Sequence, residues 1–252
     1  MKLLKNSLTF FLKYTYNLIN LLHMDTIIYN FFFLHVPIKF FFYFNSSYSG
    51  YLKEYIPQEG DIVIEGGAYT GNFTILLSRL VGKSGKVFAI EANPKICSIL
   101  KNRLKRLKIN NVIVINRGLW DNTNNIKLPI NEQTRKKGFS IATSSAEKNA
   151  ESLILQNITI DTLIQKYNIT RLNYMAMDVE GAEIEALKGA KNTLKKFNVH
   201  LAIASYHYRD GKQTYTTVEK ILKKYGYETY TDNPIHLTTY GLPTSKTPYS
   251  KE

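Results

Sequence analysis

The sequence predicts an α/β fold, a doubly wound and mostly parallel sheet of seven strands, over most of the 252-residue chain. Two observations predict it. Continuous apolar runs of strand length alternate with segments whose apolar residues recur at helical spacing. Glycine-rich or acidic motifs follow several of these runs directly. Apolar strands separated by helices are typical of a parallel sheet covered on both faces, and such sheets bind ligands at the carboxyl ends of their strands.

The same patterns place the individual elements in order. The predicted strands are residues 61–65, 86–91, 111–115, 172–177, 199–204, 227–231 and 235–240. The predicted helices are residues 72–81, a segment that begins at Pro94, residues 184–194 and residues 215–225. Pro94 suits a first helical turn, where a backbone N–H is not needed. A polar stretch at residues 122–157 is long for a connection, which indicates a functional loop or small elements of its own.

The composition divides the chain into three parts. Residues 1–47 form an aromatic-rich extension with phenylalanine and tyrosine runs at 31–33 and 40–44. Residues 48–242 carry the alternating strands and helices and are the predicted catalytic domain. Residues 243–252 are expected to be a frayed tail.

The extension must bury its aromatic side chains against something. Its longest uncharged run, residues 26–38, is shorter than the roughly 18–20 residues that a membrane span needs. Packing of residues 1–47 on the domain or on a partner is the preferred interpretation. The alternative is an interfacial helix on anionic lipid, which Lys2, Lys5 and Lys13 among leucines and phenylalanines would suit.

Charge and cysteine usage bound the class of partner and the compartment. The formal net charge is +13, from 33 basic and 20 acidic residues, which favours acidic partners or reflects a lysine-rich proteome. Cys97 is the single cysteine, so no intramolecular disulfide can form. No secretory signal is recognisable, and the predicted location is the cytoplasm, with membrane association as the alternative. The sequence leaves the oligomeric state open.

A glycine-rich turn follows the first predicted strand. Gly66, Gly67 and Gly71 give the spacing Gly-Gly-x-x-x-Gly, which lets the backbone approach a ligand closely. The dinucleotide fingerprint Gly-x-Gly-x-x-Gly is missing, so a ligand without a pyrophosphate is favoured. The alternative is a plain tight turn.

Glu91 ends the second predicted strand, 26 residues after Glu65, which suits one strand–helix–strand unit. A carboxylate in this place can accept both hydrogen bonds from a ribose diol. An acid that interacts with a helix dipole is the alternative. After the third strand, Leu119 and Trp120 are candidates for an apolar slot for adenine, and Asp121 for the acceptor of its amine. Trp120 suits a core position equally well.

An acidic block follows the fourth predicted strand. Asp178, Glu180 and Glu183 fall within six residues, where acids must be solvated, paired or used. They are candidates to bind a methionyl ammonium, to balance a sulfonium charge, or to take a proton from a nucleophile. Capping of the following helix is the alternative, and both roles are compatible.

His207 follows the fifth predicted strand and has a pKa range suited to proton transfer. A structural histidine is the alternative. The chain shows no Cys/His spacing typical of a metal site, and no metal ligands are predicted, although Asp178 with His207 is a conceivable pair.

In order, these motifs resemble those of the FkbM-type methyltransferase family. The family's first motif, Asp-x-Gly-Ala-Asn-x-Gly, stands here as Glu65, Gly67, Ala68, Tyr69 and Gly71. Glu91 before Asn93-Pro94 matches the acid of the second strand, and His207 matches a histidine after the fifth. The most specific block is Asp178-Val179-Glu180-Gly181-Ala182-Glu183, followed by Leu187, Gly189 and Ala190. Residues 158–163 resemble the family's strand before the fourth core strand.

The resemblance covers about residues 60–240 and implies a Rossmann-like methyltransferase sheet with S-adenosylmethionine as cofactor. The cofactor residues expected from the motifs and the resemblance together are Glu65, Gly67, Ala68, Gly71, Glu91, Asp121 and Asp178. The catalytic candidates are His207, Asp178 and Glu180, with His207 the first choice of base. Tyr69 in place of Asn, Gly66 in place of a bulkier residue and Glu65 in place of Asp depart from the family pattern.

Family members are implied to methylate hydroxyl groups on sugars, lipids or natural products, so the predicted acceptor is a small molecule or a glycan- or lipid-linked hydroxyl. A dehydrogenase is disfavoured by the missing dinucleotide fingerprint. A nucleic-acid methyltransferase would suit the charge, but no Asn-Pro-Pro-aromatic motif occurs, and nucleic acid is not the expected substrate. A module that binds the cofactor without turnover is the remaining alternative.

Overall fold

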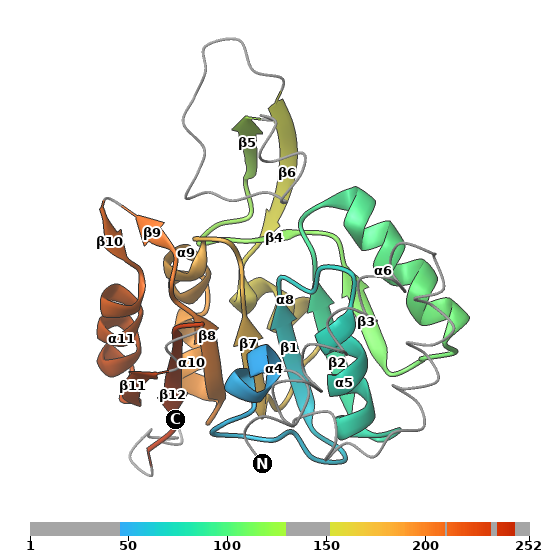
Figure 1. The fold of residues 1–252 in the computed structure, drawn as a ribbon, viewed down its shortest axis with the longest axis horizontal. Coiled ribbons are helices and arrows are strands. Elements are labelled where there is room, and N and C mark those ends of the chain that lie inside the picture. The colour runs from blue at the N-terminus through green and yellow to red at the C-terminus, as the bar shows by residue number, and fades with distance from the viewer. Residues whose placement is uncertain (1–45, 130–151, 210, 233–235, 245–252) are drawn as a thin grey trace, which may run out of the picture. The chain divides into compact units, whose positions relative to one another are not determined.

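The computed structural model describes residues 46–129, 152–209, 211–232 and 236–244, and the remaining segments are drawn in grey in Figure 1. The chain divides between Ser49 and Gly50. The unit that begins at Gly50 contains the whole of the central sheet. Nearly all of the predicted extension at 1–47 and most of the predicted tail at 243–252 lie outside the described residues, so both remain predictions.

A seven-stranded sheet forms the centre of the unit (Figure 1). Its strands are β1 (Ile62–Gly66), β2 (Lys86–Ile90), β3 (Val112–Ile115), β7 (Tyr174–Met177), β8 (His200–Ala204), β11 (Glu228–Asp232) and β12 (Thr238–Leu242). They lie in the order β11-β12-β8-β7-β1-β2-β3. Neighbours from β8 to β3 are parallel, whereas β12 runs antiparallel to both β8 and β11. The sequence prediction of a mostly parallel, doubly wound α/β sheet is confirmed.

Seven helices occur in the described part of the chain. They are α4 (Ser46–Tyr51), α5 (Asn72–Val81), α6 (Pro94–Arg106), α8 (Ile160–Lys166), α9 (Glu183–Lys188), α10 (Lys191–Lys196) and α11 (Tyr215–Lys224). Local signals explain several of their ends. The Asn93 side chain accepts hydrogen bonds from the Lys95 and Ile96 N–H groups and so caps α6, with Pro94 in the first turn.

One predicted helix, residues 184–194, is in fact two helices, α9 and α10. The Gly189 carbonyl accepts a hydrogen bond from the Asp161 N–H at 2.9 Å, and the Asp161 carboxylate accepts from the Asn192 and Thr193 N–H groups at 2.9 and 2.8 Å. Asp161 therefore caps a new helix start from outside. The apolar pattern is continuous across the break, so the sequence could not reveal it.

A second correction concerns residues 158–163, which the family resemblance assigned to a strand. Only Ile158 belongs to a strand, because α8 begins at Ile160. The Thr159 hydroxyl accepts a hydrogen bond from the Thr162 N–H at 2.9 Å, which is the bond of an N-terminal helix cap. The β-branched residues of this segment suit a strand, but the cap decides its conformation.

Small sheets lie outside the central one. β4 (Gly118–Leu119), β6 (Ser152–Ile158) and β5 (Asn125–Pro129) form a three-stranded sheet, and β9 (Tyr208–Arg209) pairs with β10 (Lys212–Gln213). In Figure 1 strands β5 and β6 project beyond the carboxyl ends of the central strands. The prediction of small elements within residues 122–157 is correct for its two ends, and residues 130–151 lie outside the description.

Side chains alternate between the two faces of the sheet. Ile64, Phe88, Met175 and Leu201 join one apolar cluster with residues of α8, α9, α10 and α11. The neighbouring position Val63 is also fully buried, as are Ile75, Leu76, Leu77 and Val81 of α5, which packs against β1 and β2. Both faces of the sheet are therefore covered, as the continuous apolar strands predict. Among the described residues, no helix has the length and apolar character that a membrane crossing requires.

Candidate active site

The candidate site begins at the junction of β1 and β7, where the strand order reverses. Strand β1 lies between β2 and β7, so the chain runs toward one edge of the sheet first and toward the other afterwards. The Asp178 N–H donates a hydrogen bond to the Gly66 carbonyl at 2.9 Å. The carboxyl ends of the two strands are thus joined by main-chain contacts at the place where such sheets bind ligands.

Gly67 continues this junction with a positive φ of 81°. A Cβ atom here would lie 1.8 Å from the Asp178 carbonyl oxygen, so only glycine fits between the segments that follow β1 and β7. The Gly67 and Ala68 N–H groups both donate to the Ile90 carbonyl at 2.9 Å. Gly71, with a φ of 91°, then leads into α5. The predicted glycine-rich turn is present, and its glycines are required by close approach and by backbone conformation.

Glu91 lies directly after β2 and faces this turn. Its Oε2 atom accepts a hydrogen bond from the Tyr69 N–H at 2.9 Å, and its Oε1 atom accepts from the Asn93 N–H at 2.8 Å. Burial raises the pKa of the Glu91 carboxyl, and the two N–H donors oppose that shift. Main-chain donors fix the orientation of the carboxylate, and each oxygen keeps a lone pair for a further donor.

We expect Glu91→Gln and Glu91→Ala to raise the dissociation constant for S-adenosylmethionine. Loss of a hydrogen bond to a charged carboxylate costs about 1–3 kcal/mol, which corresponds to a change of roughly 5- to 150-fold. Titration calorimetry measures it. Glu228→Gln, which alters an exposed carboxylate on β11, is the control. An unchanged dissociation constant in a folded Glu91→Gln protein would contradict the ribose assignment.

Glu65, the acid that precedes the glycines, is buried beside α5 with 4% of its surface exposed. Its Oε2 atom accepts a hydrogen bond from the Thr74 hydroxyl at 2.6 Å. Burial raises the pKa of Glu65 to about 8, although the Thr74 hydroxyl opposes the shift. The residue therefore keeps its proton in the folded protein at neutral pH, and its predicted contact with a cofactor remains a prediction.

This raised pKa has a consequence for stability. Between the usual pKa of about 4.5 and the folded value of about 8, the folded protein holds a proton that the unfolded chain has released. The free energy of unfolding should therefore fall as the pH rises through this range. We expect Glu65→Gln to remove that part of the slope, with the gain over the parent largest near pH 8.5. Urea denaturation at about pH 5, 7 and 8.5 tests it, and parallel profiles for the two proteins would refute it.

The predicted adenine slot is only partly assembled. Leu119 is buried, and its Cδ1 atom would lie 2.7 Å from a Cβ atom on Gly66, so it does reach the end of β1. Asp121 is exposed, and its Oδ1 atom accepts a hydrogen bond from the neighbouring Asn122 side chain at 2.7 Å. The assignment of Asp121 to the adenine amine stays a prediction.

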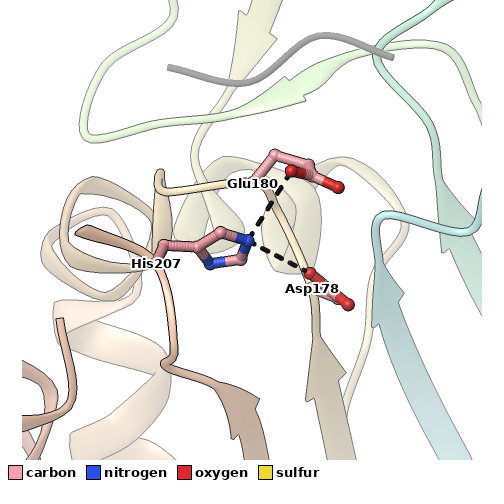
Figure 2. Close-up of side chains that lie close together, drawn as sticks. All are labelled: Asp178, Glu180 and His207. Atoms are coloured by element: carbon pink, nitrogen blue, oxygen red, sulfur yellow. Dashed lines mark ion pairs between the residues drawn. The ribbon is translucent and has the colours of Figure 1, made fainter. Parts of the chain in front are cut away.

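The three predicted catalytic residues lie together (Figure 2). Asp178 and Glu180 follow β7, and His207 follows β8. His207 Nε2 lies 3.8 Å from Asp178 Oδ1 and 3.6 Å from Glu180 Oε2, while its Nδ1 atom lies 2.9 Å from Glu183 Oε1. Glu183 is fully buried. Glu180 has a φ of 53°, an unusual backbone conformation for a residue other than glycine.

A side-chain cap does not account for the acidic block, although Glu183 lies in the first turn of α9, where an acid favours the helix dipole. Ala182 is the N-terminal cap residue of α9, and no side chain hydrogen-bonds to the helix start there. Asp178 instead accepts hydrogen bonds from two tyrosines. The Tyr51 hydroxyl donates to Oδ2 at 3.0 Å, and the Tyr206 hydroxyl lies 3.3 and 3.4 Å from the two oxygens. His236 Nε2 lies 3.5 Å from Oδ2.

Tyr51, Tyr206 and His236 were not predicted as site residues. Tyr206 adjoins the predicted His207, so proximity could have indicated it. His236 precedes β12, and because β12 is antiparallel its beginning lies at the edge where the parallel strands end. An antiparallel assignment of the last strand would have identified His236. Nothing in the local sequence marks Tyr51, which lies 127 residues from Asp178.

The charges of the cluster decide which group can accept a proton. Burial lowers the pKa of His207, but the carboxylates of Glu180, Glu183 and Asp178 outweigh burial and raise it to about 10. Burial raises the pKa of Asp178, but contacts with His236, His207 and Tyr51 outweigh burial and lower it below its usual range. At neutral pH this arrangement contains an imidazolium and an ionised Asp178. These shifts favour a carboxylate as the base, and the assignment of the base among His207, Asp178 and Glu180 stays a prediction.

The sheet order and the site define an α/β methyltransferase that uses S-adenosylmethionine. Residues 65–229 match the methyltransferase FkbM domain, and the chain belongs to that family. The predicted family, fold and cofactor are therefore confirmed.

Individual relatives are distant. The chain is 26% identical over 141 residues to hexuronic acid methyltransferase AglP of Haloferax volcanii, covering 56% of this chain and 54% of that protein. It is 23% identical over 140 residues to the probable cobalt-precorrin-6B C(15)-methyltransferase (decarboxylating) of Sulfurisphaera tokodaii, covering 54% and 72% of the two chains. The match to AglP thus spans about half the length of that relative.

Among solved structures, methyltransferase FkbM from Methylobacillus flagellatus KT superposes with a TM-score of 0.53 at 20% identity. The match covers 72% of this chain and 43% of that one. At this level of identity the likeness concerns the fold.

The turn after β1 fits the cofactor of the family. At Gly67 the backbone after β1 lies so close to the backbone of Asp178 that no Cβ atom fits between them. Glu91 contacts the same turn and keeps lone pairs that can accept hydrogen bonds from a ribose diol. Glu91 and the turn from Gly67 to Gly71 are thus the residues that would hold the nucleoside, and Asp178 lies next to them at the end of β7.

Proposed function

We propose that this methyltransferase acts on a hydroxyl oxygen of a sugar, either free or linked to a glycan or lipid. The observation that carries the proposal is Asp178, an ionised carboxylate among hydroxyl and imidazole groups at the site. Its side chain is 30% exposed, so an acceptor can reach it. A hydroxyl nucleophile needs a group that takes its proton, and a fixed carboxylate serves this need.

S-adenosylmethionine supplies the methyl group from its sulfonium when it is bound. The chain's own residues do the remaining work. Gly67, Ala68 and Glu91 hold the donor at the strand ends, and Asp178 orients the acceptor hydroxyl and takes its proton. Because the donor is already activated, the position of the hydroxyl oxygen accounts for much of the rate. Tyr51 and Tyr206 keep the carboxylate in place.

The similarity to a hexuronic acid methyltransferase supports a sugar as the acceptor. The many lysines and arginines, which give a net charge of +13, also suit an acidic sugar. The predicted membrane contact through residues 1–47 would suit a lipid-linked acceptor, but that segment lies outside the described residues.

The test is transfer of isotopically labelled methyl from S-adenosylmethionine to a panel of acceptors. The panel contains hexuronic acids, neutral sugars, lipid-linked glycans, small natural products with hydroxyl groups, and RNA. Mass spectrometry and NMR then identify the methylated atom. We expect an O-methyl ether on a sugar. Methylation of carbon, or of a nucleic-acid base alone, would refute the proposal.

A further inference from the structure

His207 is held so that one ring nitrogen is directed between two carboxylates. The side chain is 6% exposed, and Glu183 Oε1 lies 2.9 Å from its Nδ1 atom. Since a carboxylate can only accept, this short contact favours a hydrogen on Nδ1. The second proton of the imidazolium is then on Nε2, and if it is released the lone pair of Nε2 points toward Asp178 and Glu180 (Figure 2).

Both ring nitrogens are inaccessible to solvent, and neither makes a hydrogen bond of regular geometry in the described part of the chain. The distances of 3.6 Å from Nε2 to Glu180 Oε2 and 3.8 Å from Nε2 to Asp178 Oδ1 are too long for a hydrogen bond. A buried polar atom without a partner is costly. The Nε2 atom and the two carboxylate oxygens are therefore spaced like three donor atoms around a common ion, rather than like hydrogen-bond partners of one another.

We propose that Asp178, Glu180 and His207 bind a divalent first-row transition-metal ion, and that Glu183 positions His207 for this role. One donor atom from each residue lies within 4.8 Å of the others. Metal–ligand bonds of about 2.0–2.2 Å place tetrahedral donors about 3.4 Å apart, so the observed separations require only small side-chain movements. A carboxylate behind a metal-binding histidine is the usual means of fixing the ring and its tautomer.

The contacts of Asp178 divide its two oxygens between two roles. Oδ2 is held by the Tyr51 hydroxyl at 3.0 Å and lies 3.5 Å from His236 Nε2. Oδ1 is the oxygen that approaches His207. One oxygen is thus anchored to the protein while the other is directed at the metal position, which keeps the carboxylate from rotating away.

The donor set indicates the kind of ion. Imidazole nitrogen with two carboxylates suits Mn²⁺, Fe²⁺, Co²⁺ or Zn²⁺, whereas Mg²⁺ prefers oxygen alone and retains its waters. Three protein ligands leave coordination positions open. The Glu180 side chain is 48% exposed, so the cluster is open to solvent on that side. There an ion would bind the acceptor hydroxyl and lower its pKa, and the lone pair that remains on Asp178 Oδ2 would take the proton. This role, unlike cation binding itself, rests on the proposed function.

The test is a titration of the metal-free full-length protein with Mn²⁺ alone, with free Mn²⁺ measured by electron paramagnetic resonance. We expect one Mn²⁺ per chain and weak competition by Mg²⁺. Asp178→Asn and His207→Gln should each raise the dissociation constant by at least about 10-fold. Glu183→Gln should raise it by about 10- to 100-fold without abolishing binding, because it acts through the ring of His207.

Asp232→Asn and Glu228→Gln, which change exposed acids on β11, are matched controls and should bind Mn²⁺ as the parent does. Circular dichroism of each metal-free variant verifies its fold. If the parent binds no stoichiometric Mn²⁺ or Zn²⁺, or if the cluster variants bind as the controls do, the three residues form only an ion-paired cluster. No cofactor or acceptor enters this measurement, so a parent that binds Mn²⁺ but methylates no hydroxyl contradicts the proposed function alone.

Discussion

Replacing Asp178 by asparagine should lower kcat by about 10²- to 10⁴-fold, the range that a positioned proton acceptor contributes. The asparagine side chain keeps the shape of the carboxylate and can still accept from the Tyr51 hydroxyl. It loses the charge that takes a proton from the acceptor and that pairs with His207 and His236. The measurement is steady-state kinetics on the acceptor identified by methyl transfer.

The control for this variant is Asp232→Asn, since Asp232 pairs with Lys53 in an exposed salt bridge of a kind worth little. Both variants should melt close to the parent, and only Asp178→Asn should lose activity. The affinity for S-adenosylmethionine, measured separately, distinguishes a loss of chemistry from a loss of cofactor. Full activity of a folded Asp178→Asn protein would show that the carboxylate is structural.

Gly67→Ala should be the most destabilising small substitution at the site. The added Cβ atom would lie 1.8 Å from the Asp178 carbonyl oxygen, and the backbone φ of 81° already disfavours a side chain. Overpacking of about 1–3 kcal/mol and a left-handed conformation of about 1–2 kcal/mol together predict a loss of roughly 2–5 kcal/mol. Urea denaturation measures the free energy of unfolding directly.

Gly211→Ala separates the two contributions. Gly211 has a φ of 75°, but no atom lies within 4 Å of the position that a Cβ atom would take there, so only the conformational cost applies. We expect about 1–2 kcal/mol for this control. If Gly67→Ala lowers the free energy of unfolding no more than Gly211→Ala does, the segments after β1 and β7 can move apart without a measurable loss of stability. The Gly67→Ala variant should also bind S-adenosylmethionine more weakly, because the shifted turn carries the predicted cofactor residues.

The sheet was predictable because its strands are buried on both faces and therefore apolar throughout. The helix at residues 72–81 was predicted with the bounds of α5 because glycines stand at both of its ends. The division into α9 and α10 was not predictable, because it depends on a cap from Asp161, about 30 residues earlier in the chain. Element bounds set by local residues can be read from sequence, whereas those set by tertiary contacts cannot.

The candidate site divides in the same way. Asp178, Glu180 and His207 end adjacent parallel strands, so strand order alone brings them together. Tyr51 and His236 reach Asp178 from outside that set of strand ends, and no local pattern distinguishes them. The raised pKa of His207 could not be predicted from sequence either, because it depends on three carboxylates that surround the ring in space.

The short segment at Gly50 and Tyr51 affects how the site forms during folding. The Tyr240 hydroxyl donates to the Gly50 carbonyl across 190 residues, and the Tyr174 hydroxyl donates to the Tyr51 carbonyl across 123. Contacts so distant along the chain close large loops and form slowly. Tyr51 can hold Asp178 only after the beginning, the middle and the end of the domain have met. Catalytic competence should therefore be acquired last, once β12 has been synthesised and has joined the sheet, and a partly synthesised or partly folded chain would not consume methyl donor.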